Sequence, residues 1–283
     1  MTSLNKLIET ERPIVICDIG ASPVDATPFI DDLINNTNSI LYGFEPNEDE
    51  FKKLNQSERK KYFDIAVGNG KAETLNICEA PGLTSILEPD LQYLNLFHGF
   101  AEWAKIIKKI NIKTKKLDEI NFKEKIDFFK IDVQGYEYEI INHGKNKIKE
   151  SLIVQIETSP IPIYKNEKPF SYICSTLEEL GFNLHMFNQI NTRCFKPMIV
   201  QEDIYAGGVN HLFQLDCVFI KNLNLIDSLS VEELKKLSLI LFYSFKSYDL
   251  AGMLIQRISE IESVNYIEQY NDHLRTIKIN RNY

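Results

Sequence analysis

The sequence predicts an α/β fold: a mostly parallel, seven-stranded Rossmann-like sheet, flanked by helices and followed by a helical C-terminal appendage. Short apolar runs rich in Ile, Val, Leu and Phe alternate with segments of helical periodicity between residues 14 and 220. A glycine turn follows the first apolar run, at Gly20. Ligands of open α/β sheets bind at the carboxyl ends of the strands, so a pocket is expected at this turn.

The core strands are assigned to seven apolar runs, at residues 14–18, 39–44, 61–65, 126–131, 151–157, 182–187 and 212–220. Helical spacing predicts helices at residues 25–36, 47–56, 137–143, 170–180 and within 91–109. Residues 73–79 and 110–116 alternate apolar and polar side chains and are candidate extra strands. Residues 188–211 contain Asn, Pro and two adjacent glycines, and are predicted to form a long loop over the active site.

The pattern after residue 225 is helical, so residues 1–225 are assigned to one domain and residues 226–283 to a helical appendage. Ser230 and Glu233 have the spacing of a capping box at the start of a first apolar helix. A second helix is expected from Leu250 to Ile261. The two helices pack either on this chain or on a second copy, which makes the appendage a candidate homo-oligomer interface.

The charge composition limits the classes of binding partner to be expected. A net charge of −8, without a basic stripe, argues against a nucleic-acid partner. Six lysines nevertheless gather in one segment, at Lys105, Lys108, Lys109, Lys113, Lys115 and Lys116. They form either a solvated surface or a binding surface for an anionic substrate such as a sugar nucleotide or an acidic glycan.

The cysteines and the apolar runs indicate the compartment. The chain has five cysteines and no Cys-x-x-Cys motif, which suits a reducing cytoplasm. Residues 1–13 lack the apolar core of a signal peptide, and no apolar run approaches the ~18 residues of a membrane span. We therefore expect a cytoplasmic location and no membrane partner.

The glycine turn reads Asp18-Ile19-Gly20-Ala21-Ser22, and the next apolar run ends at Glu45-Pro46. An acidic residue at this second strand end accepts hydrogen bonds from both ribose hydroxyls of a bound nucleotide. A pyrophosphate loop would require Gly-x-Gly-x-x-Gly, and only one glycine is present. The pattern favours a nucleoside without phosphates, such as S-adenosylmethionine. An ordinary strand–turn–helix in a non-binding protein is the alternative.

Further motifs follow in a fixed order: Asp64-Ile65-Ala66-Val67-Gly68 and then Lys130-Ile131-Asp132-Val133-Gln134-Gly135-Tyr136-Glu137. With Asp-x-Gly-Ala and Phe44-Glu45-Pro46, this order and spacing resemble the FkbM family of S-adenosylmethionine-dependent O-methyltransferases. The resemblance covers roughly residues 13–220 and implies a class I methyltransferase fold. It also implies S-adenosylmethionine as cofactor and a hydroxyl as methyl acceptor.

Candidate cofactor-binding residues lie at successive strand ends. Gly20 and Ala21, followed by Ser22, would present backbone groups to the amino-acid half of the cofactor, while Asp18 would orient the loop or accept from the ammonium. Glu45, followed by Pro46, would bind the ribose diol. Three residues, Asp64, Ile65 and Ala66, are assigned to the adenine: the carboxylate would accept from its amino group and the other two would pack on the ring. Ser85 matches a serine of the family and would contact the methionine carboxylate. Asp64 as a turn cap and Ser85 as a turn serine are the alternatives.

Candidate catalytic residues are Asp132, Glu157 and His211, because an attacking hydroxyl needs help to lose its proton. The two acids follow strands that should be neighbours, and could hold a divalent metal or supply a base. Histidine is the usual base near neutral pH. Hydrogen-bonded, non-catalytic histidines, and a helix-capping role for Asp132, remain open.

The function predicted from the sequence is therefore O-methylation of a small-molecule hydroxyl on a sugar nucleotide, a glycan precursor or a related metabolite. Two alternatives stay open. An NAD-type oxidoreductase could use the same fold, although the phosphate-binding glycines are missing. A non-catalytic scaffold could also retain the fold, since Ser22-Pro23 replaces the Asn and Gly usual in the family loop.

Overall fold

The computed structural model describes residues 4–23, 27–199, 208 and 210–277. These residues divide into two compact units. The larger lies within residues 15–26 and 41–222, and the smaller within residues 1–14, 27–40 and 223–283. The predicted domain boundary at residue 225 stays a prediction.

The central sheet has seven strands in the order β3-β2-β1-β7-β8-β10-β9. Their bounds are β1 (Ile14–Ile19), β2 (Ser39–Phe44), β3 (Lys60–Phe63), β7 (Phe128–Ile131), β8 (Ile153–Thr158), β9 (Phe182–Arg193) and β10 (His211–Lys221). The pairs β2–β3, β1–β7 and β7–β8 are parallel, and β10 runs antiparallel to both β8 and β9. All seven strands lie at the predicted positions, so the mostly parallel Rossmann-like sheet is confirmed.

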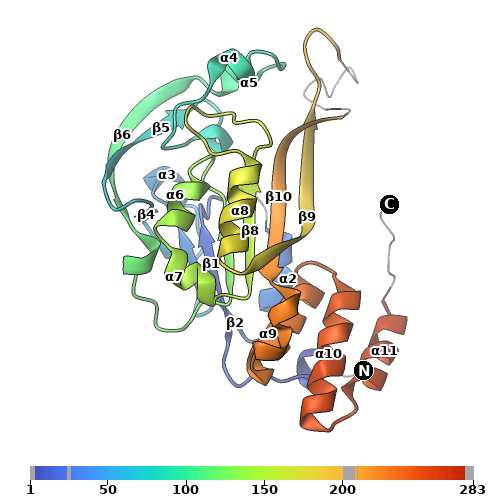
Figure 1. Ribbon diagram of the computed structural model, residues 1–283. Coiled ribbons are helices and arrows are strands. Elements are labelled where there is room, and N and C mark those ends of the chain that lie inside the picture. Colours follow the sequence, from blue (N-terminus) through green and yellow to red (C-terminus); the bar gives the residue numbers. More distant parts are fainter. Residues whose placement is uncertain (1–3, 24–26, 200–207, 209, 278–283) are drawn as a thin grey trace. The chain divides into compact units, whose positions relative to one another are not determined.

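One predicted loop is wrong over part of its length. Residues 188–193 continue strand β9, which pairs with β10 as far as Arg193 and His211. The two strands form the long antiparallel pair that extends beyond β8 in Figure 1. The remainder of the predicted loop includes residues 200–207 and 209, which lie outside the described residues.

A second, smaller sheet contains the two candidate extra strands. Its order is β4-β6-β5, with β4 (Ala66–Val67), β5 (Ala72–Cys78) and β6 (Ile106–Lys115). The prediction of one helix within residues 91–109 was too simple. The chain forms two single-turn helices, α4 (Leu91–Leu94) and α5 (Phe100–Trp103), before β6 begins. The helix expected at 47–56 is likewise one turn, α3 (Glu48–Phe51).

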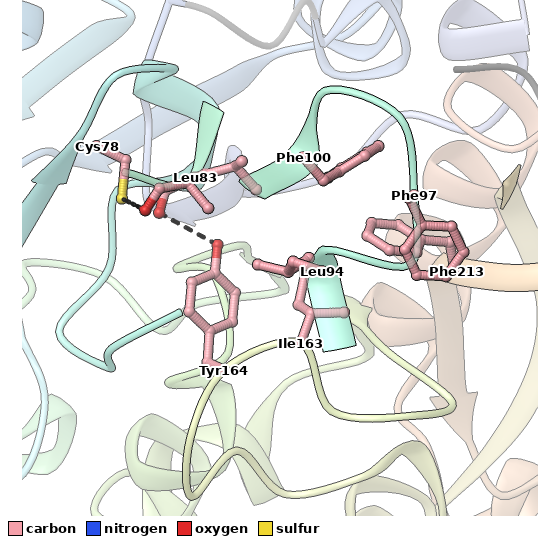
Figure 2. Close-up of a cluster of buried hydrophobic side chains, with 9 residues drawn as sticks. Cys78, Leu83, Leu94, Phe97, Phe100, Ile163, Tyr164 and Phe213 are labelled. Atoms are coloured by element: carbon pink, nitrogen blue, oxygen red, sulfur yellow. Dashed lines mark hydrogen bonds between the residues drawn. The ribbon is translucent and has the colours of Figure 1, made fainter. Parts of the chain in front are cut away.

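An aromatic cluster explains why residues 91–104 do not form one straight helix. Leu94, Phe97 and Phe100 are buried with Phe213 of β10 and with Tyr164, as Figure 2 shows. The rings of Phe97 and Phe213 pack edge to face at 5.1 Å between centroids. The break at Gly99, which has a φ of 78°, lets side chains from both short helices reach the same cluster.

Three helices of the larger unit pack beside the central sheet: α6 (Glu137–Asn142), α7 (Lys145–Glu150) and α8 (Phe170–Glu179) (Figure 1). Strands β7 and β8 are buried along nearly their whole length. This explains why most of their residues are apolar, with Lys130 in β7 and Gln155 and Glu157 in β8 among the exceptions, because a parallel strand covered on both faces has no exposed side.

The smaller unit is helical apart from the strand ends it includes. It contains α1 (Leu4–Leu7), α2 (Pro28–Asn36), α9 (Val231–Tyr243), α10 (Tyr248–Glu262) and α11 (Tyr266–Arg275). The Ser230–Glu233 capping box is present. Helix α9 packs on α2, and Phe29 stacks on Phe245 at 6.0 Å between centroids. Among the described residues, no helix has both the length and the apolar character needed to cross a bilayer.

Leu237 tests the contribution of this helical packing to stability. Its side chain is fully buried in α9, so Leu237→Ala should lower the free energy of unfolding by about 2–5 kcal/mol. Leu225, which is 49% exposed, provides the matched control, and Leu225→Ala should cost less than about 0.5 kcal/mol. Urea denaturation measures both. Equal midpoints for the two variants would contradict the packing described.

Candidate active site

A pocket lies at the carboxyl edge of the central sheet, where the predicted ligand site was placed. Four strand ends contribute to its lining: Gly20 and Ser22 after β1, Glu45 and Pro46 after β2, Ile65 after β3, and Asp132 and Gln134 after β7. Leu75 of β5 and the segment that contains Ser85 form the opposite wall. Because the carboxyl ends of these strands lie at the same edge of the sheet, residues that are distant in sequence line one cavity.

The sequence-predicted residues divide into two groups. Eight line the pocket: Gly20, Ser22, Glu45, Pro46, Ile65, Ala66, Ser85 and Asp132. Five lie outside its lining: Asp18, Ala21, Asp64, Glu157 and His211. Of these, Asp18 and Ala21 are buried and Asp64 is exposed to solvent. The individual ligand contacts assigned to these residues stay predictions.

Gly20 is required by a close approach between two loops. Its φ is 86°, and a Cβ added there would lie 1.7 Å from the carbonyl oxygen of Asp132. The N–H groups of Gly20 and Ala21 both donate to the carbonyl of Phe44, at 3.0 and 3.1 Å. These donors hold the loop against β2, so a backbone contact from Gly20 or Ala21 to a ligand would use a carbonyl oxygen.

A buried ammonium joins the first loop to the loop after β7. Lys130 Nζ lies 3.4 Å from both Asp18 Oδ1 and Asp132 Oδ2, and all three side chains are at most 12% exposed. Burial raises the pKa of the Asp18 carboxyl, and the Lys130 charge opposes that shift. Asp18 thus acts beneath the loop, where it fixes Lys130 and, through it, Asp132.

Glu45 is the buried acid at the end of β2. Its Oε1 accepts from the backbone N–H of Asn47 at 2.7 Å. Burial, reinforced by nearby acids including Glu50, raises the pKa of the Glu45 carboxyl to about 7. Glu50 also lines the pocket, and its Oε1 accepts from Lys53 at 2.7 Å. Glu50 Oε2 is buried and has no hydrogen-bond partner among the described residues, as expected of an atom placed for a ligand.

The loop between β7 and α6 is held in an unusual backbone conformation. Gln134 and Gly135 have φ values of 58° and 93°. Glu137 Oε1 accepts from the N–H groups of Val133 and Gly135 at 2.9 and 3.0 Å. Ser85 Oγ donates to the carbonyl of Gln134 at 2.6 Å, so Ser85 supports the loop as well as lining the pocket.

The side chain of Gln134 joins the two predicted catalytic acids. Its Nε2 donates to Asp132 Oδ1 at 3.0 Å and to Glu157 Oε2 at 2.5 Å. Gln214 Nε2 donates to the same Glu157 oxygen at 3.0 Å, and the Tyr164 hydroxyl donates to Gln134 Oε1 at 3.0 Å. Asp132 and Glu157 therefore converge, as the strand order predicted.

Three members of this polar cluster, Gln134, Gln214 and Tyr164, were missed by sequence reasoning. Gln134 stands inside the Lys130–Glu137 motif, so its position after a buried strand was an available signal. Gln214 lies within a long apolar strand and Tyr164 in an irregular segment. Neither has a local pattern that distinguishes it from other polar strand or loop residues.

His211 has a different environment from the two acids. Its Nε2 is 2.8 Å from the Tyr93 hydroxyl, and its ring lies 4.5 Å from that of Phe195 and 5.7 Å from that of Phe97. These contacts correspond to the hydrogen-bonded alternative. Among the described residues, no group of three or more His, Cys, Asp or Glu side chains is arranged to hold a metal ion.

The lysine-rich segment falls mainly on strand β6. Lys108, Lys113 and Lys115 are exposed, and Lys109 pairs with Glu88 at 2.9 Å. The assignment of an anionic ligand to this surface stays a prediction.

The fold and the pocket together define a Rossmann-like domain with a ligand pocket at the carboxyl ends of its strands. The sequence matches the model of the methyltransferase FkbM domain over residues 18–184. The chain therefore belongs to the FkbM methyltransferase family. No curated protein matches the sequence.

Several solved structures are similar at low identity. Magnesium protoporphyrin IX methyltransferase from Synechocystis PCC 6803, with bound S-adenosylmethionine, is 9% identical, with 74% of this chain and 71% of that chain covered and a TM-score of 0.39. A putative methyltransferase from Thermoplasma acidophilum is 9% identical, at 75% and 70% coverage and a TM-score of 0.38. Human methyltransferase-like protein 13, in complex with SAH, is 10% identical. The match covers 100% of this chain and 90% of that chain, with a TM-score of 0.37.

The buried carboxyl groups of Glu137 and Glu167 should make the free energy of unfolding depend on pH. Burial, with Glu167 nearby, raises the pKa of Glu137 to about 8, and burial raises that of Glu167 to about 7. The unfolded chain releases both protons near the ordinary value of 4.5. Between these values the folded protein binds more protons, so its free energy of unfolding should fall as pH rises.

Urea denaturation at pH 5.5, 7.0 and 8.5 checks this expectation. Wild type should lose up to about 5 kcal/mol across the series, since each group contributes about 1.4 kcal/mol per pH unit until its folded-state pKa is reached. Glu137→Gln should reduce the slope, because an uncharged amide can still accept both backbone bonds. Glu150→Gln, at an exposed position on α7, is the control. A slope unchanged by Glu137→Gln would contradict the protonated, buried Glu137.

Proposed function

We propose that this protein is an S-adenosylmethionine-dependent O-methyltransferase whose acceptor is a hydroxyl of a sugar nucleotide, a glycan precursor or a related metabolite. The observation that carries the proposal is the Asp132–Gln134–Glu157 cluster at the end of the pocket. Asp132 and Gln134 also line the pocket itself, so the cluster reaches from the cofactor cavity to the next strand end.

The residues of the pocket fit the cofactor. Glu45 would accept from the ribose hydroxyls, and the apolar side chains of Ile65, Ala66 and Leu75 would pack on the adenine ring. Glu50, with a buried oxygen that lacks a partner among the described residues, is better placed than the exposed Asp64 to accept a further hydrogen bond from the adenosine half. The bound cofactor supplies an electrophilic methyl group on a sulfonium.

The two acids differ in their suitability as a base. Asp132 is paired with the Lys130 ammonium at 3.4 Å, which neutralises its charge. Glu157 instead accepts from two neutral amides, those of Gln134 and Gln214. We assign Glu157 as the proton acceptor for the attacking hydroxyl, and Asp132 and Gln134 as residues that orient the acceptor and the Glu157 carboxylate.

The two alternative functions fit less well. An NAD-type enzyme would need backbone N–H donors for a pyrophosphate, and those of Gly20 and Ala21 are already used by Phe44. A non-catalytic scaffold would bind the cofactor without turnover. The activity test below separates that outcome from methyl transfer.

Glu45→Gln should weaken binding of S-adenosylhomocysteine about ten- to hundred-fold, because charge-assisted bonds to the ribose are lost. Wild-type affinity should also fall below pH 7, by up to about tenfold per pH unit, since the ribose hydroxyls favour the ionised carboxylate. Calorimetry at pH 5.5–8 measures both effects. Glu48→Gln, at an exposed position of α3, is the control. An affinity independent of both Glu45 and pH would remove Glu45 from the ribose site.

Glu157→Gln should lower the turnover rate by roughly 10²–10⁴ with little change in cofactor affinity, since the base is lost but the pocket is not. The assay follows a labelled methyl group from S-adenosylmethionine to a panel of nucleoside-diphosphate sugars and glycosides. Glu179→Gln, on the exposed side of α8, is the control.

Outcomes of the same assay separate the remaining mechanisms. Loss of turnover with a chelator and recovery with added divalent metal would point to a metal-assisted reaction. A large loss in His211→Ala, with Glu157→Gln fully active, would identify His211 as the base instead. Cofactor binding without transfer to any member of the panel would favour the scaffold.

A further inference from the structure

A polar surface lies on one face of three neighbouring strands, next to the pocket. It consists of Glu157 of β8, Gln214 and Asp216 of β10, and Gln189 and Asn191 of β9. We call these five residues the amide surface. The register pairs Asp216 with Glu157 on one side and with Gln189 on the other, and pairs Gln214 with Asn191. Directly paired residues share a face of a sheet, as do residues two apart on one strand, so all five side chains lie together.

The alternation along these strands separates the amide surface from the hydrophobic core. Cys217, which follows Asp216, is fully buried, and its partner Phe187 contacts Phe170 of α8 at 6.1 Å between ring centroids. The five polar residues are all partly or fully accessible to solvent. On β10 the opposite face is therefore the packed one, since Phe213, Leu215 and Cys217 are buried there, and the polar face is accessible to a ligand.

The amide surface is continuous with the cofactor pocket. Gln134 lines the pocket and donates to Glu157 at 2.5 Å. Glu157 in turn accepts from Gln214 at 3.0 Å, and Gln189 donates to Asn191 at 2.9 Å on the neighbouring strand. A ligand bound here would therefore place one group beside Glu157, at the end of the pocket where the methyl group is to be transferred.

The chemistry of the surface selects the kind of acceptor. Side-chain amides donate and accept hydrogen bonds, and carboxylates accept them, which matches the hydroxyls of a sugar ring. Neighbouring groups are separated by about 4.8 Å across strands and about 6.8 Å along a strand, so several of them can contact one bound ligand. Glu157 and Asp216 place two acidic side chains on the surface, so an anionic ring on it would be repelled.

We propose that the amide surface binds the methyl acceptor, and that the ring it holds is a neutral, polyhydroxylated sugar rather than a uronic acid. This inference rests on the proposed function, which it deepens by naming the acceptor site. Any charged group of the acceptor, such as a nucleotide diphosphate, extends away from the surface. Figure 1 shows β9 and β10 extending beyond β8, so the ladder that carries Gln189, Asn191 and Gln214 continues past the end of that strand.

The surface carries its own reporters, because three of its residues have side-chain NH₂ groups that give separate ¹H–¹⁵N signals. Protein saturated with S-adenosylhomocysteine is titrated with the methyl glycosides of glucose, galactose and mannose, and in parallel with the corresponding uronic acids. At least one neutral glycoside should shift the NH₂ signals of Gln189, Asn191 and Gln214. Its uronic counterpart should bind at least about tenfold more weakly.

Two variants and a control complete the test. Asn191→Leu should abolish the sugar-induced shifts, and Asp216→Asn should narrow the difference between neutral and acidic sugars. Asn111→Leu replaces an exposed Asn on strand β6. It should change neither the sugar-induced shifts nor the difference between neutral and acidic sugars.

Affinity for S-adenosylhomocysteine is measured on every sample. Retained cofactor affinity with no shift from any neutral glycoside, or equal binding of neutral and acidic sugars, would overturn the assignment of this surface alone. Loss of cofactor binding by wild type would instead contradict the proposed function.

Discussion

The buried contact of Lys130 with two aspartates is the interaction on which the site depends. Lys130 lies in strand β7. Its ammonium is 3.4 Å from Asp18, near the end of β1, and 3.4 Å from Asp132, in the loop after β7. Removing one member of a buried ionic group leaves uncompensated charge, which is strongly destabilising. The same contact explains why Gly20 packs directly against the Asp132 carbonyl, where a side chain would not fit. The positions of the two loops are thus set together.

The loop after β7 links this buried contact to the proposed catalytic residues. Glu137 binds two backbone N–H groups, and Ser85 donates to the Gln134 carbonyl, so the left-handed backbone at Gln134 is supported from both sides. Held this way, the Gln134 amide bridges Asp132 and Glu157. Strained backbone that the surrounding structure over-determines is typical of functional sites. The cofactor pocket and the proposed acceptor surface meet at this one residue.

An aromatic cluster packs against strand β10 near this edge of the sheet. The cluster of Phe97, Phe100 and Phe213 packs the two short helices against β10 (Figure 2). His211 joins it through Tyr93 and Phe195, at the start of the strand that also carries Gln214 and Asp216. The face of β10 that bears Gln214 and Asp216 stays polar because the packing is concentrated on the other.

The sequence by itself determined the strands, the mostly parallel sheet, the family and the approximate place of the pocket, because all of these follow from local periodicity and short motifs. Ile65 and Ala66 were placed at the pocket for the same reason: they stand at the end of the predicted strand 61–65, within the Asp64–Gly68 motif. Tertiary structure decided the rest. Residues 188–193 looked like a loop because they are mostly polar, and strand pairing with β10 is invisible in local composition. Glu50, Gln134, Tyr164 and Gln214 acquire their roles only from neighbours far away in the chain, since a hydrogen-bond partner is fixed by strand order and register rather than by sequence spacing.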